Sequence, residues 1–168
     1  MNTIKLSSRP VREPEFLNKG RYLVIDPCYV LGQSGFITGE ADDVWNRFCD
    51  EILPIDERNN WVIQITVGNK TYDVVCFSTA YGDGCYPVFD SGVELGHCGV
   101  DAGLLSFIPD KLIKEIGGDN YLGVWINIPS KFMIQWTGEG KWDRGGDARV
   151  GNIVICTCGC MIEDDVVR

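Results

Sequence analysis

The chain contains one histidine, no Cys-x-x-Cys pair and no long apolar run, and each absence excludes a class of protein. A single histidine excludes the His-Glu-x-x-His motif of zinc proteases, and the commonest zinc-knuckle spacing is missing as well. The longest apolar runs, such as 74–77 and 153–156, are far shorter than the roughly 18 residues that a membrane helix needs. We therefore expect no membrane partner.

Motifs of nucleotide-binding and hydrolase sites are also missing. The sequence has no Gly-x-x-x-x-Gly-Lys-[Ser/Thr] loop, no Gly-x-Gly-x-x-Gly motif and no Gly-x-Ser-x-Gly elbow. The opening residues, MNTIKLSSRPVREPEF, lack the apolar segment of a secretory signal. We expect a cytoplasmic protein with reduced cysteines and no cofactor.

Positive charge is scarce. The 168 residues carry 15 Lys and Arg against 24 Asp and Glu, a formal net charge of −9. Direct nucleic-acid binding is not expected, because it depends on Lys and Arg that displace counterions from phosphates. The acids are scattered, which is typical of a soluble surface, and an acidic surface that imitates nucleic acid is the alternative.

Cysteine, in contrast, is abundant, with eight residues, and three of them alternate at Cys156, Cys158 and Cys160. Alternate residues of a strand lie roughly 6.5–7 Å apart, so a shared zinc ion would require a turn at Gly159. The competing interpretations are small apolar side chains on a buried strand, a metal site and a redox site. A catalytic thiol would need a base such as His97, which is the neighbour of Cys98 in sequence but points to the opposite face of a strand.

Hydrophobic periodicity predicts a mainly β (α+β) fold. The apolar stripe of 41–53 predicts the main helix, and Pro109 followed by Gly117-Gly118 predicts a short helix over 109–116. We expect one domain, an antiparallel sandwich or partly open barrel with the main helix packed on it. Residues 1–20 read as an N-terminal arm or edge segment, and 138–151 as a loop. Strands are predicted over 21–25, 34–38, 61–67, 71–78, 85–89, 94–101, 121–128, 131–137 and 151–158, with hairpins across 68–70, 90–92 and 129–130.

Carboxylates and tyrosines gather beside glycine or proline in three segments. The most unusual is Thr79–Val88, in which Gly82-Asp83-Gly84 permits backbone geometries that other residues avoid. The others are Ile25–Tyr29 and Gly99–Gly103, each with an aspartate after an apolar strand. These acids are either turn residues or a binding surface at one end of a β domain. The candidate ligand-binding residues are Tyr81, Asp83, Tyr86, Asp101, Asp26 and His97, with no catalytic and no metal residue assigned.

The segments Gly82-Asp-Gly-Cys-Tyr-Pro-Val88 and Val100-Asp-Ala-Gly103 resemble a family of uncharacterised bacterial and phage proteins, a domain of unknown function. The resemblance covers about residues 71–108 and rests on the Gly-Asp-Gly-x-Tyr-Pro-Val strand followed by a strand that ends in an acid. It implies a β-rich cytosolic domain and brings no activity with it. By analogy, a small accessory protein of phage type is expected.

Three functions are compatible with these observations. The first is a non-enzymatic binding module for a small molecule, such as a signalling nucleotide, or for a host protein. The second is a small metal-dependent hydrolase that uses Asp26, Asp83 or Asp101 with Mg²⁺ or Ca²⁺, the cations that prefer carboxylate oxygens. The third is an acidic inhibitor that binds a basic host protein. The sequence leaves the oligomeric state open.

Overall fold

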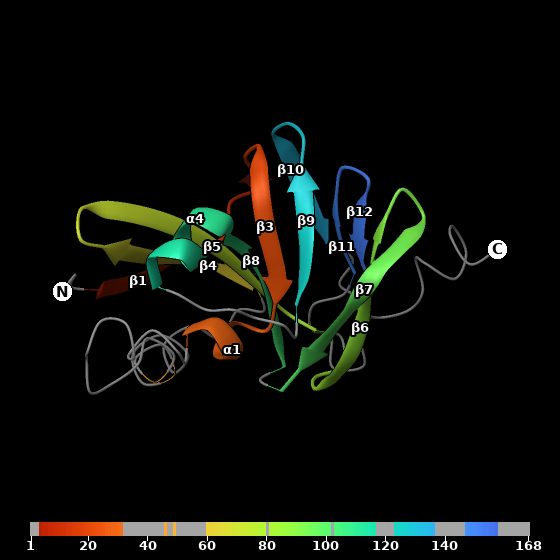
Figure 1. The fold of residues 1–168 in the computed structure, drawn as a ribbon, viewed down its shortest axis with the longest axis horizontal. Coiled ribbons are helices and arrows are strands. Elements are labelled where there is room, and N and C mark those ends of the chain that lie inside the picture. The colour runs from red at the N-terminus through yellow and green to blue at the C-terminus, as the bar shows by residue number, and fades with distance from the viewer. Residues whose placement is uncertain are drawn as a thin grey trace.

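The computed structural model describes residues 4–31, 46, 49, 60–79, 81–101, 103–116, 123–136 and 147–157. These residues form two antiparallel six-stranded sheets, so the expectation of a mainly β fold is confirmed (Figure 1). The first sheet has the order β1-β4-β5-β8-β3-β9 and the second the order β2-β10-β11-β12-β6-β7. The first contains β1 (Ile4–Pro10), β3 (Gly20–Ile25), β4 (Asn60–Val67), β5 (Lys70–Ser78), β8 (Leu104–Pro109) and β9 (Val124–Ile128). The second contains β2 (Phe16–Leu17), β6 (Gly84–Asp90), β7 (Val93–Val100), β10 (Phe132–Trp136), β11 (Ala148–Val150) and β12 (Ile153–Ile155).

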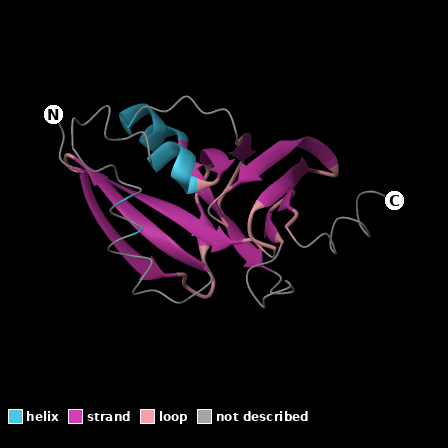
Figure 2. Cartoon of the chain, turned by 90° about the horizontal axis from the view of Figure 1, so that it is seen from below, coloured by secondary structure: helices cyan, strands magenta, loops and turns pink. Residues whose placement is uncertain are grey.

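The inner strands β3 and β8 of the first sheet are buried on both faces, which explains their nearly continuous apolar sequences. Along β3, the side chains of Tyr22 and Val24 join a core that also contains Val88 and Ile155 of the second sheet. The intervening Leu23 and Ile25 belong to a second core on the opposite face. That second core includes residues of two helices, α1 (Pro27–Leu31) and α4 (Asp110–Ile116), which lie together on one side of the sheet in Figure 2.

Most local predictions agree with the observed elements. The hairpins over β4–β5 and β6–β7 form where the turn residues indicate, and α4 matches the short helix expected after Pro109. The expected arm or edge segment contains β1, an edge strand that pairs with β4 over its whole length. The predicted strand 34–38 and most of the predicted helix 41–53 lie outside the described residues. Asn46 and Cys49, the two described residues of that helix, are helical.

Two predictions of local structure are wrong. Strands β9 and β10 do not form a hairpin across Pro129-Ser130, because β9 pairs with β3 in the first sheet and β10 pairs with β2 and β11 in the second. The proline and serine therefore carry the chain between sheets. The expected loop 138–151 includes a strand, β11, and its Gly151-Asn152 turn leads directly into β12. No described helix is long and apolar enough to cross a membrane.

Candidate functional site

Two loops that are separate in the sequence, one after β5 and one before β8, meet at one end of the sandwich. The main-chain N–H of Thr79, just after β5, donates to the carbonyl of Gly103, just before β8, at 3.0 Å. Pairing of Gly84 with Val100 brings the first residues of β6 next to the last residues of β7. The described residues of these two connections therefore lie at the same end of the fold. We call the surface formed by the described residues of 26–29, 79–84 and 101–103 the loop end.

Buried Asp26 joins a third connection to these two. Its side chain is fully buried, and Oδ1 accepts the main-chain N–H of Cys28 at 3.0 Å. The other oxygen, Oδ2, accepts the main-chain N–H of Asp101 at 2.8 Å. The Asp26 carboxylate therefore fixes the backbone that carries Asp101. Because Asp26 is buried, it can position a ligand-binding residue but does not face a ligand on the surface.

Asp101 itself is exposed, and its Oδ2 accepts a short hydrogen bond from the hydroxyl of Tyr29. This hydrogen bond to a carboxylate, assisted by burial, raises the pKa of Tyr29 well above its ordinary value. The phenol therefore stays protonated and keeps donating to Asp101. Tyr29 comes from α1, whose first residue is Pro27, a residue that suits the first position of a helix.

Two hydroxyl groups stabilise the Gly82-Asp83-Gly84 turn by hydrogen bonds. Both the Thr79 Oγ1 and the Tyr86 hydroxyl donate to the carbonyl oxygen of Gly82, at 2.5 and 2.8 Å. Gly82 and Gly103 have φ values of 76° and 70°, a left-handed conformation that favours glycine. Tyr86 is buried, whereas Asp83 is exposed and Tyr81 exposes 49% of its surface. The turn thus presents Tyr81 and Asp83 and retains Tyr86 as a support.

His97 is the one candidate that lies apart from this network. It is exposed on β7, and its Nε2 lies 3.2 Å from Oε1 of Glu94 on the same strand. Cys98 points inward, as the alternation of strand residues predicts, and its thiol donates to the carbonyl of Val24 at 3.2 Å. Cys85 is exposed in β6, on the same face as His97 and diagonal to it in the ladder, but no hydrogen bond joins the two side chains. Cys76 is buried in the first sheet.

The described cysteines form no disulfide with one another. Cys156 is buried against Phe89 and Val154, as expected for a cysteine acting as a small apolar side chain, while Cys158 and Cys160 lie outside the described residues. Burial, together with the nearby Asp26 carboxylate, raises the pKa of Cys28 far above its ordinary value, so this thiol is not a ready nucleophile. Across the described ranges, no group of three or more His, Cys, Asp or Glu is placed to hold a metal ion.

Sequence reasoning found the acids of the loop end but missed two of the residues that hold them. Tyr29 and Thr79 belong to the segments singled out in the sequence, yet their hydroxyls carry no pattern that identifies their partners. No model of a protein family, no curated protein and no solved structure matches this chain.

Proposed function

We propose that this protein is a non-catalytic binding module whose loop end captures a cationic side chain of a partner protein. The proposal is supported by one observation above all: an exposed carboxylate, Asp101, is held in place by a buried carboxylate, Asp26, and by the Tyr29 hydroxyl. Ordering a binding group before the partner arrives reduces the entropy lost on binding. A preorganised carboxylate is a good partner for guanidinium, which forms charge-assisted hydrogen bonds with it.

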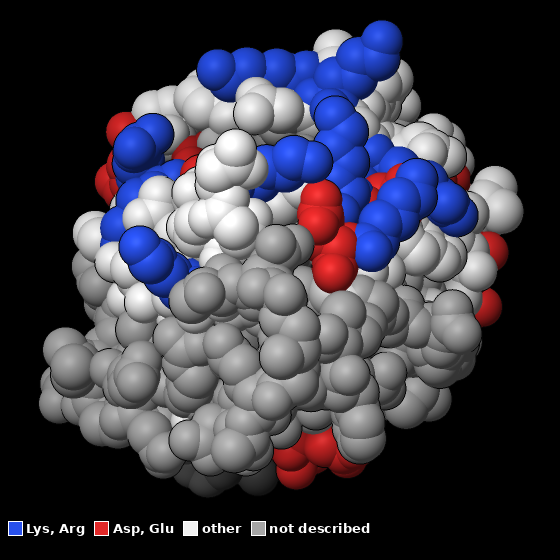
Figure 3. All heavy atoms as spheres, turned by 60° about the vertical axis from the view of Figure 1, so that its left-hand side comes forward, with Lys and Arg blue, Asp and Glu red and all other residues white. Residues whose placement is uncertain are grey.

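The surroundings of Asp101 favour a positively charged ligand. The sequence has no Lys or Arg from Thr71 to Asp110, although this stretch contains Asp83, Asp90, Glu94 and Asp101. The half-exposed ring of Tyr81 lies in the adjoining loop and offers an aromatic face to a cation. Lys70 at the β4–β5 turn and Lys114 in α4 pair with acids of α4, in another part of the fold. Figure 3 shows many lysine and arginine side chains on the side of the molecule where Figure 1 draws these elements.

The hydrolase alternative receives less support from the geometry. Both oxygens of Asp26 accept main-chain N–H groups, so Asp26 has little capacity left for a cation. The acidic-inhibitor alternative shares the preference for a basic partner but depends on many acids spread over the surface, Glu94 included, and not on one preorganised carboxylate. The proposed module and the acidic inhibitor are distinguished by which carboxylates the partner requires for binding.

The test uses the full chain and a capped tripeptide, acetyl-Gly-Arg-Gly-amide, with its citrulline analogue as the neutral isostere. We expect the arginine peptide to shift the backbone NMR signals of the loop end and the citrulline peptide to shift none. Asp101→Asn, Asp83→Asn and Tyr81→Ala should each weaken binding about threefold or more, and added salt should weaken it further. Melting temperatures should stay close to that of the parent, because all three side chains are exposed.

Glu94→Gln is the matched control, since Glu94 is an exposed acid of the same hairpin that pairs with His97 away from the loop end. If Glu94→Gln weakens binding as much as Asp101→Asn, the acidic-inhibitor function is favoured. Binding of Mg²⁺ or Ca²⁺ at the loop end would favour the hydrolase. Equal binding of the arginine and citrulline peptides, or none at millimolar concentration, would reject the proposal.

A further inference from the structure

A groove of about 790 Å³ lies on a different surface, between the connection 11–15 and the last residues of β10. One wall is the chain from Val11 to Glu15, which links the edge strand of the first sheet to the edge strand of the second. The groove's size falls within the usual range for ligand sites. Its other wall contains Met133 and Trp136 of β10, and Asn60 also lines it.

The groove runs along a sheet edge that is only partly covered. Strand β2 is two residues long, and beyond it the N–H of Ile134 donates to the carbonyl of Glu15 at 2.8 Å. Main-chain groups of successive residues in an antiparallel strand point to alternate sides. The N–H and C=O of Gln135 therefore face β11, and those of Trp136 face the same side as Ile134, where β2 has already ended. Among the described residues neither group of Trp136 has a hydrogen-bond partner, so Trp136 presents one donor and one acceptor to the groove.

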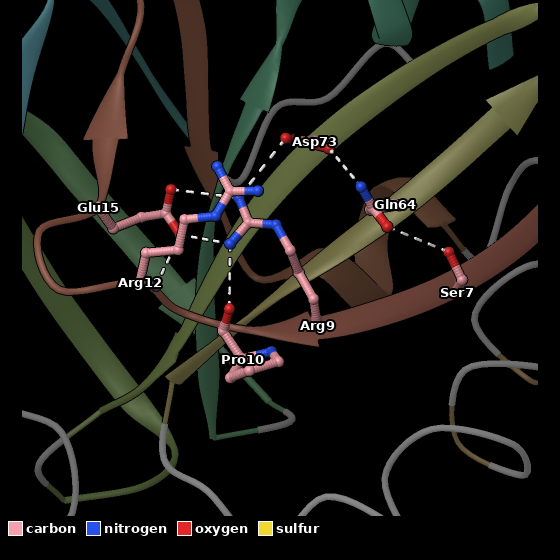
Figure 4. Close-up of polar contacts among 7 residues, drawn as sticks. All are labelled: Ser7, Arg9, Pro10, Arg12, Glu15, Gln64 and Asp73. Atoms are coloured by element: carbon pink, nitrogen blue, oxygen red, sulfur yellow. Dashed lines mark hydrogen bonds and ion pairs between the residues drawn. The ribbon is translucent and has the colours of Figure 1, made fainter.

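The wall formed by residues 11–15 is held in place by side-chain hydrogen bonds, so the groove exists before any ligand binds. Figure 4 shows Arg9 extending from β1 to the side chain of Glu15. The guanidinium donates to Glu15 through Nη1 at 2.6 Å and Nη2 at 3.2 Å. Glu15 Oε1 also accepts the main-chain N–H of Arg12 at 3.0 Å. A bidentate pair of this kind fixes geometry as well as adding energy, and here it keeps the 11–15 connection away from Trp136.

Apolar groups line the groove beside this free edge. Met133 exposes 42% of its surface, and Val11 and Trp136 are partly buried against the main core. Two polar side-chain atoms of the lining, Asn60 Oδ1 and Trp136 Nε1, have no hydrogen-bond partner in the part of the chain that the structure describes. Both atoms are buried, so a ligand in the groove would contact the main chain of Trp136 and the side chain of Met133 instead.

We infer that this groove binds a short extended segment of a partner protein, which adds to the edge of β10 next to β2. One residue of the segment exchanges two hydrogen bonds with the main chain of Trp136, and a neighbouring apolar side chain rests on Met133. A peptide backbone offers one donor and one acceptor per residue on each side, which matches what Trp136 presents. This inference concerns a surface other than the loop end and does not depend on it.

The experiment selects binders from a displayed library of random octapeptides against the full chain and then follows the synthetic peptides by backbone NMR. We expect the Trp136 amide hydrogen to shift and to gain protection from solvent exchange when the peptide binds. The amides of Ile134 and Gln135 serve as internal controls, since both are already bonded within the sheet. N-methylation of the peptide residue that faces Trp136 should weaken binding about tenfold, with no change to the protein.

Substitutions supply an independent check. Met133→Glu should weaken binding about tenfold, whereas Leu95→Glu, at a site with 45% exposure on β7, should leave it unchanged. A binder that leaves the Trp136 amide exchanging freely, or that tolerates both N-methylation and Met133→Glu, overturns the inference. So does a selection that returns no peptide able to protect Trp136.

Discussion

The buried Asp26 carboxylate accepts the main-chain N–H of Asp101 across 75 residues of sequence, at 2.8 Å. This bond links the end of β3 to the end of β7, and therefore links one sheet to the other. Its second oxygen holds the N–H of Cys28 at the start of α1. One side chain thus connects both sheets and a helix, and the shape of the loop end depends on it.

Replacing this carboxylate should be costly. In the parent protein, each oxygen of the Asp26 carboxylate accepts one main-chain N–H. In Asp26→Asn, an NH₂ group replaces one of these oxygens, so one of the two N–H groups loses its acceptor. We expect a loss of about 2–3 kcal/mol in the free energy of unfolding, the usual penalty for a buried hydrogen bond to a charged group. Urea unfolding measures it, with Asp83→Asn as the control because Asp83 is exposed. Equal stability of the two variants would show that Asp26 is not a structural link.

A glycine at the start of β9 is required for close packing against β3. A Cβ at Gly123 would lie 2.7 Å from the carbonyl oxygen of Val24 and 2.8 Å from the Cβ of Ile25. Neither atom can move away cheaply, because both belong to the buried strand β3, which is hydrogen-bonded to β8 on one side and β9 on the other. Gly123→Ala should therefore destabilise the protein by about 1–3 kcal/mol, the range for overpacking.

Gly99 in β7 provides the matched substitution. A Cβ there meets nothing within 4 Å, so Gly99→Ala should leave the melting temperature nearly unchanged. Thermal unfolding followed by circular dichroism compares the two variants directly. If both alanine variants melt alike, the close approach of β9 to β3 is wrong.

The sequence predicts strands and turns better than it predicts their partners. Alternating and β-branched residues mark β4 and β5 reliably, because a local pattern decides whether a segment can be extended. Pro129-Ser130 is read as a hairpin turn for the same reason, yet β9 and β10 enter different sheets. Which sheet a strand joins is decided by packing between residues far apart in sequence, such as Val24 with Cys98.

The candidate site shows the same difference between what a local pattern predicts and what tertiary contacts decide. Asp26, Asp83 and Asp101 are predicted together because acids beside Gly or Pro follow apolar strands, and strand ends tend to gather. The buried role of Asp26 and the bond from Tyr29 to Asp101 depend on tertiary contacts that no spacing encodes. The groove beside Trp136 could not be predicted from sequence either, because its existence depends on β2 ending after two residues.

The Arg9–Glu15 pair predicts a specific pH dependence of stability. Burial alone would raise the pKa of Glu15, but hydrogen bonds from the Arg9 guanidinium and the Arg12 N–H outweigh it, and the pKa lies below its ordinary value. A carboxyl whose pKa is lower in the folded chain stabilises the fold above its unfolded pKa of about 4.3. That contribution is lost as the pH falls through the folded pKa.

We therefore expect Glu15→Gln to be less stable than the parent at pH 7 and the difference to shrink as the pH falls from about 4.3 toward 2. Urea unfolding across this range provides the measurement. Glu13→Gln is the control, since Glu13 is an exposed neighbour for which no ion pair is found in the described chain. A difference that stays constant down to pH 2 would contradict the assignment.

Thiol reactivity provides the last prediction, because burial distinguishes one exposed cysteine from three buried ones. Cys85 is exposed, whereas Cys76, Cys98 and Cys156 are buried. Burial raises the pKa of Cys98 to about 12, and its thiol donates to the Val24 carbonyl, so the thiolate that reacts with alkylating agents is almost absent at neutral pH. Brief treatment of the native protein with iodoacetamide at pH 7.5, a condition set by the ordinary thiol pKa of about 8.5, should label Cys85 and spare these three. Peptide mass spectrometry identifies the labelled sites, and a second sample unfolded in guanidinium chloride shows that all four can react. Labelling of Cys98 as fast as Cys85 in the native protein would mean that the core between β3 and β7 opens readily, which the hydrogen bond between Cys98 and Val24 argues against. Equally fast labelling of Cys76 would mean that the second core, on the other face of the first sheet, opens readily.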